Sequence, residues 1–143
     1  ALAPYTMFIG SGALWGETIL FSMCILEEMQ WKRTRYITSA DFFHGTLELV
    51  EPGVPVFLFM GEDENRKLDE RVRAFLTRGV TGDTDINIID TAEFAIPGLD
   101  DEFRVIVSPW ILSSLITDRL AAYYETVTKH NLNYRRYYHQ FDY

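Results

Sequence analysis

Residues 54–60 read VPVFLFM, and this stretch decides the expected fold. It is a continuous apolar run without alternation, which is typical of a strand buried on both faces of a parallel sheet. Helices are therefore expected on both sides of that sheet. Further strands are predicted for YTMFI at 5–9, RYIT at 35–38 and the isoleucine-rich run at 86–89. Residues 92–96 are a candidate for a short fifth strand.

Helical patterns separate these strands. Residues 16–30 are apolar at nearly every position, so this helix is expected to be covered on more than one side, with another subunit as one candidate cover. A helical turn is expected at 42–50, and an amphipathic surface helix at 68–76. The last helix is predicted at 109–129, or from about residue 101 with a kink at the proline. The alternation predicts an α/β fold, a three-layer α/β/α sandwich around a parallel sheet of four to five strands.

Length and charge limit the classes of function. The chain has 143 residues, enough for one domain, and a formal net charge of −8. Nucleic acid and anionic membranes are not expected as partners, because both need clustered cations. The single cysteine, Cys24, allows no internal disulfide. No uncharged apolar stretch reaches the roughly 18 to 20 residues of a membrane span, and no export signal is visible, so we expect a cytoplasmic protein. The chain enters a strand almost at once without an initiator Met, which suggests a fragment.

Two titratable residues are candidates for chemistry. Glu28 ends the apolar helix, where the helix dipole and apolar neighbours disfavour a charged carboxylate and make it a better base for taking a proton next to a carbonyl. The alternative is a solvated helix end in which Glu28 pairs with Lys32. His44 lies in the stretch ADFFHGTLELVEPG at 40–53 and could act as an acid or base, or be a structural histidine. At this point both alternatives stay open.

No cofactor or metal is expected. The turn GSGALWG at 10–16 does not have the G-x-G-x-x-G spacing of a dinucleotide site, and no P-loop lysine follows it. The three histidines, His44, His130 and His139, are not spaced like metal ligands, and Cys24 has no partner cysteine.

Two stretches together carry a family resemblance. LEEMQW at 26–31, followed by SADFFHGTLELVEPGVPVFLF at 39–59, resembles the second domain of the sugar isomerase (SIS) family. The resemblance implies a flavodoxin-like sandwich in which a catalytic glutamate precedes a loop of the type S-G-E-x-x-H-G-P. Glu28 matches the glutamate and His44 the histidine. The loop departs from the pattern at three positions: Ala40, Asp41 and Thr46.

Within that family the chain looks most like deglycases of Amadori-type fructosamine 6-phosphates, such as fructoselysine 6-phosphate or 6-phosphofructose-aspartate. The resemblance implies that residues 1–130 are the C-terminal half of a two-domain homodimeric enzyme, and that the tail at 131–143 docks near the active site. His44 would help to open the sugar ring, and Glu28 would move a proton between C1 and C2, releasing glucose 6-phosphate and an amino acid. Residues expected to bind the substrate are Ser39, Asp41 and Arg136. An isomerase or a sugar phosphate-binding regulatory module remains an alternative.

Overall fold

A four-stranded parallel sheet forms the centre of the computed structural model, which describes residues 3–142. The strands are β1 (Thr6–Gly10), β2 (Thr34–Ile37), β3 (Val56–Met60) and β4 (Ile86–Asp90). Their order is β2-β1-β3-β4, so the chain crosses over β1 to reach β3. The central pair is fully covered: Phe8 on β1 and Leu58 on β3 have no exposed surface. The strand predicted from VPVFLFM is confirmed.

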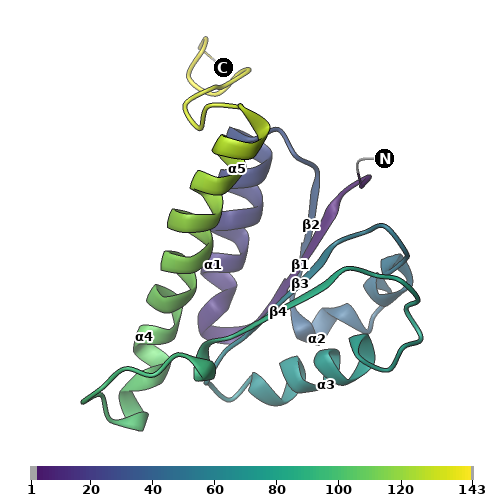
Figure 1. Cartoon of the computed structure of the whole chain (residues 1–143), viewed down its shortest axis with the longest axis vertical. Coiled ribbons are helices and arrows are strands. Elements are labelled where there is room, and N and C mark those ends of the chain that lie inside the picture. The colour runs from purple at the N-terminus through teal and green to yellow at the C-terminus, as the bar shows by residue number, and fades with distance from the viewer. Residues whose placement is uncertain (1–2, 143) are drawn as a thin grey trace.

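Two long helical segments cover one face of the sheet (Figure 1). The first is built from the 3₁₀ turn η1 (Gly12–Leu14), the helix α1 (Trp15–Ile19) and the π-helical stretch η2 (Leu20–Met29). The second joins α4 (Asp101–Ser113), the π-helical η5 (Ser114–Leu120) and α5 (Ala121–Thr128). Phe21, Leu26, Leu112 and Ile116 from these segments pack with Phe8 in one buried cluster. This explains why residues 16–30 are apolar on more than one side.

The opposite face is covered by shorter helices, which complete three layers (Figure 1). They are α2 (Ser39–Phe42), the 3₁₀ turn η3 (Thr46–Leu49) and α3 (Arg66–Leu76). Val72 and Leu76 of α3 are buried against Val56 and Leu58 of β3. The single helical turn predicted for 42–50 is instead divided at Gly45, whose φ of 144° lies outside helical values.

The candidate fifth strand at 92–96 is not observed. Residues Thr91–Glu93 form a 3₁₀ turn, η4, in which the side chain of Asp90 accepts a hydrogen bond from the backbone of Ala92. This cap turns the chain away from the edge of β4, so the described sheet has four strands. The lower end of the predicted range of four to five is therefore correct.

The helix runs from Asp101 to Thr128 through Pro109, so the earlier of the two predicted starts is correct, while the kink expected at the proline stays a prediction. By length and composition it is apolar enough to cross a membrane, a test that core helices of soluble proteins also pass. Only 22% of its most apolar window is buried in this chain. Ile106, Trp110 and Val127 are 65%, 77% and 80% exposed. An apolar face of this helix therefore has no cover within residues 3–142.

Candidate active site

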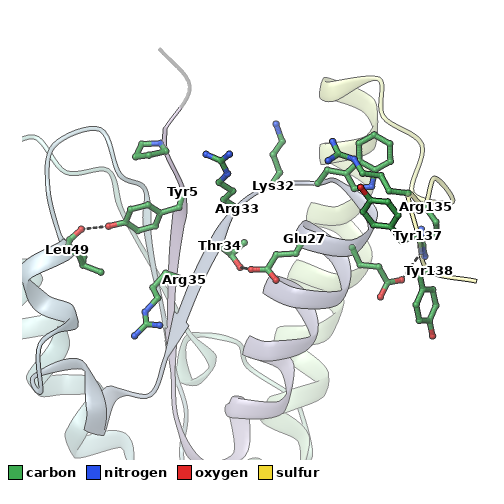
Figure 2. Close-up of a pocket in the computed structure, with 14 residues that line it drawn as sticks. Tyr5, Glu27, Lys32, Arg33, Thr34, Arg35, Leu49, Arg135, Tyr137 and Tyr138 are labelled. Carbon is green, nitrogen blue, oxygen red and sulfur yellow. Dashed lines mark hydrogen bonds and ion pairs between the residues drawn. The ribbon is translucent and has the colours of Figure 1, made fainter. Parts of the chain in front are cut away.

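A large pocket lies at the amino ends of β1 and β2 (Figure 2). Its volume is about 1100 Å³, and its walls come from the start of β1, the end of η2, the start of β2 and the C-terminal tail. Glu28 lines this pocket because the helix from residue 12 to 29 runs back against the strands, which puts its last turn at their amino ends. Parallel sheets more often bind ligands at the carboxyl ends of their strands, so this position is unusual.

Glu28 forms an ion pair with Arg135 of the C-terminal tail and not with Lys32, four residues further along the chain. Nε of Arg135 lies 2.8 Å from Oε1 of Glu28, and the Glu28 side chain is 29% exposed. The described structure shows no ion pair between Glu28 and Lys32, so the local alternative is not observed. Arg135 also donates hydrogen bonds to the backbone carbonyls of Leu132 and Tyr134. Glu28 is thus a partly buried carboxylate in the pocket wall whose partner is a cation from the C-terminal tail.

Trp31 holds the tail over this pocket. Its backbone is left-handed, with φ at 54°, which is costly for a bulky residue and turns the indole outward after η2 ends. The guanidinium of Arg136 lies 4.1 Å from the centre of the Trp31 ring, and the His130 ring packs edge-on at 4.4 Å. Gln30 donates a hydrogen bond of 2.7 Å to the carbonyl of His130. The tail thus lies at the same end of the molecule as the start of β1 (Figure 1).

His44 lies elsewhere. It is exposed and lines a second pocket of about 470 Å³ together with Arg35, Asp41 and Thr46. This pocket follows the carboxyl end of β2, whereas Glu28 lies beside its amino end, and a strand of four residues spans about 13 Å. Within one protomer the two predicted catalytic residues therefore line different pockets, which adjoin because Arg35 and Leu49 line both.

The predicted substrate-binding residues differ in their surroundings. Arg136 lines the larger pocket and Asp41 the smaller one. Asp41 also accepts a hydrogen bond of 2.7 Å from the Thr38 hydroxyl, which caps α2. Ser39 is 1% exposed and lines neither pocket. Its hydroxyl donates to Asp69 at 2.6 Å, so its polar groups are used inside the protein.

At the carboxyl ends of β1, β2 and β3, polar groups of the protein form hydrogen bonds with one another. The backbone of Ser39 donates to the Ser11 hydroxyl at 2.8 Å, and Asp69 also accepts from the backbone of Gly61. Burial raises the pKa of Asp69 above its ordinary value. Asp63 accepts a hydrogen bond of 2.5 Å from the backbone of Ala13, at the start of the first helical segment. A carboxylate thus occupies the helix start where such folds often bind a ligand's anion.

Several residues of the larger pocket were not anticipated from the sequence. Trp31 and Lys32 were assigned no part in a site, although the cluster KRTR at 32–35 is conspicuous in an acidic chain. That local excess of positive charge was the signal that could have found the pocket. No cluster of three or more potential metal ligands occurs among the described residues.

Comparison with known proteins gives clear relatives, although no family model matches the chain. The fructosamine deglycase FrlB of Bacillus subtilis is 32% identical over 136 residues, which cover 93% of this chain and 39% of the relative. Fructoselysine 6-phosphate deglycase of Escherichia coli is 35% identical over 116 residues, which cover 79% of this chain and 31% of the relative. The chain is homologous to these deglycases. It spans less than two fifths of the length of either one.

A solved structure supports the same relationship. A Bacillus subtilis protein described as a candidate phosphosugar isomerase superposes with a TM-score of 0.87 at 28% identity, covering 99% of this chain and 42% of that one. The α/β fold and the SIS resemblance of residues 26–31 and 39–59 are thereby confirmed. The homologues are deglycases and phosphosugar isomerases, which are enzymes.

Proposed function

We propose that this chain is part of a deglycase that cleaves an Amadori-type fructosamine 6-phosphate into glucose 6-phosphate and a free amino acid. The observation that carries the proposal is the 32–35% identity to a fructosamine deglycase and a fructoselysine 6-phosphate deglycase. We place the activity in a longer protein, because the chain spans only part of these relatives. In this proposal the enzyme is cytoplasmic and residues 1–130 form its second SIS domain.

Glu28 is the proton-transfer residue in this proposal. In the open-chain substrate the amine nitrogen is bonded to C1 and the carbonyl is at C2. Glu28 takes a proton from C1 and returns one to C2, while the C2 oxygen gains a proton and the amine nitrogen loses one, so that the ketose amine becomes an imine between C1 and nitrogen with a hydroxyl at C2. Water then adds to C1, the bond between C1 and nitrogen breaks, and glucose 6-phosphate and the amino acid leave. The position of Glu28 in the wall of the larger pocket supports this role.

His44 opens the sugar ring by transferring a proton at the ring oxygen. His44 and Glu28 line different, adjoining pockets of one chain, and in this proposal the active site combines Glu28 of one protomer with His44 of a second protomer. Asp41 accompanies His44, and Arg136 reaches the substrate from the tail. Ser39 supports the His44 loop through its bonds to Ser11 and Asp69. A homodimer is thus required for turnover.

The test is Glu28→Gln in the full-length enzyme, assayed against a panel of fructosamine 6-phosphates for released amino acid and glucose 6-phosphate. We expect a folded protein whose kcat falls by about two to four powers of ten, because the amide cannot accept the proton. Glu64→Gln is the matched control, since Glu64 is exposed and lines neither pocket. Near-normal turnover by the Glu28 variant would remove this residue from its role.

A phosphosugar isomerase is the second candidate, favoured by the structural neighbour at 28% identity. It shares the proton transfer between C1 and C2 but releases no amine. Interconversion of a ketose and an aldose phosphate, with no amino acid released from any member of the panel, would select the isomerase. A regulatory module that only binds a sugar phosphate would need no base at position 28.

A further inference from the structure

The lining of the larger pocket has a net charge opposite in sign to that of the whole protein. The chain carries a net charge of −8, yet the pocket is lined by more cations than anions. Its five cationic side chains are Lys32, Arg33, Arg35, Arg135 and Arg136, and its carboxylates are Glu27 and Glu28. A local excess of positive charge in a concave site on an acidic protein attracts an anionic ligand group.

Three of these cations already have partners. Arg135 is paired with Glu28, and Arg136 lies over the ring of Trp31. Arg35 reaches the Thr46 hydroxyl with a long hydrogen bond of 3.4 Å. These three cations therefore already interact with other side chains of the protein.

The other two, Lys32 and Arg33, have free charged groups. Neither side chain makes a hydrogen bond or an ion pair within residues 3–142. Both extend from the start of the edge strand β2, between Tyr5 on one side and Arg135 on the other (Figure 2). Glu27, the nearby carboxylate, accepts a hydrogen bond from Thr34 instead. Two adjacent cations without a partner thus line the pocket that Glu28 also lines, and their side chains extend away from Glu27 (Figure 2).

We propose that Lys32 and Arg33 bind the carboxylate of the amino acid portion of the substrate. This inference rests on the proposed function, in which Glu28 acts at C1. The amine nitrogen is bonded to C1, and when the sugar is attached through the α-amine of an amino acid, the carboxylate is on the carbon next to that nitrogen. The phosphate is on C6, at the far end of the sugar. The substrate anion that lies near Glu28 is therefore the carboxylate, and an Arg guanidinium matches its two oxygens.

The consequence is a restriction on the released amine. An α-amino acid with a free carboxylate pairs with both cations, whereas a neutral amide or a simple amine offers neither of them a charged partner. We therefore assign the pair to selecting substrates with a free α-carboxylate, whichever side chain the amino acid carries.

The experiment compares two substrates with the full-length enzyme. One is the fructosamine 6-phosphate of the amino acid that the wild type cleaves best, and the other is the same compound with the α-carboxylate converted to an amide. For Arg33→Gln and Lys32→Gln we expect kcat/KM to fall about 10- to 100-fold on the acid and less than about threefold on the amide. Arg33→Lys keeps the charge and is expected to retain part of the preference. Arg78→Gln, an exposed arginine outside both pockets, is the control.

Two results would overturn the inference while leaving the proposed function standing. An equal loss on acid and amide would mean that the pair serves the phosphate or another part of the longer protein. Unchanged kinetics in both variants would mean that the pair does not touch the substrate. A wild-type enzyme that releases no amino acid from any fructosamine 6-phosphate would overturn both proposals, and circular dichroism of each variant separates misfolding from lost recognition.

Discussion

Asp90 ends β4 with an ion pair that can be tested by pH. Both of its carboxylate oxygens accept from the guanidinium of Arg66, at 2.9 and 2.6 Å, and the Asp90 side chain is 5% exposed. The hydrogen bond from Arg66 lowers the pKa of Asp90 below its ordinary value of 3.8. A carboxyl with a lowered folded-state pKa stabilises the fold above its unfolded pKa and loses that contribution as the pH falls through the lowered value.

We expect Asp90→Asn to lower the free energy of unfolding by about 1.5 to 3 kcal/mol at neutral pH, because one charged hydrogen-bond partner is lost. The difference from wild type should begin to shrink as the pH falls below about 4, where the unfolded chain binds the proton at this carboxyl, and should be lost once the pH is below the lowered folded-state pKa. Urea unfolding of the 143-residue chain across this range measures both effects. Glu70→Gln is the control: Glu70 pairs with the same Arg66 at 3.4 Å but is 58% exposed, so its effect should stay below about 1 kcal/mol. A pH-independent difference for Asp90 would contradict the expectation.

At the scale of elements, the sequence predicts best where one local property decides the structure. VPVFLFM gives β3 because a continuous apolar run fits only a strand covered on both faces. Residues 92–96 lack such a signal, and the capping bond from Ala92 to Asp90 decides their turn. The helical turn at 42–50 was divided at Gly45, a local break that the pattern alone did not locate.

The candidate site depends on contacts that are distant in sequence. Glu28 and His44 could be named because they occur in a short paired motif. The partner of Glu28 could not, since Lys32 is four residues away and Arg135 is 107 residues away in the chain. The burial of Ser39 depends likewise on Asp69 from α3, which only the folded sheet brings beside it. Local spacing gives candidate residues, whereas tertiary packing decides their partners.

The tail from residue 131 onward is an element whose attachment can be measured. Its packing on Trp31 combines a cation–π contact from Arg136 with the edge-on ring of His130, together about 1 to 2 kcal/mol. We expect Trp31→Ala to release the tail and to raise trypsin cleavage after Arg135 and Arg136 by about tenfold. Mass spectrometry of a digestion time course gives the rates. Trp110→Ala is the matched control, because Trp110 is 77% exposed on α4, and an unchanged rate in the Trp31 variant would contradict this role.

The whole molecule leaves apolar side chains uncovered on both long helical segments. Leu20 and Met23 on η2 are 37% and 40% exposed, and Ile106, Trp110 and Val127 are exposed on the longest helix. Burying apolar surface of this kind contributes about 25 cal/mol per Å². The proposed active site also requires a second protomer to bring His44 to Glu28. Both considerations favour a second copy of the chain as the cover.

We therefore expect the 143-residue chain to dimerise and the double variant Trp110→Glu, Val127→Glu to be monomeric at the same concentration. Both side chains are at least 77% exposed, so the charges should leave the fold intact while they repel the partner face by more than about tenfold in affinity. Sedimentation velocity over a concentration series measures the change. Val80→Glu introduces the same charge at a 68% exposed apolar residue away from these helices, and it should leave the dimer unchanged. A wild-type chain that stays monomeric would assign the face to the rest of the longer protein, and an active full-length monomer would rule out a site shared between two copies.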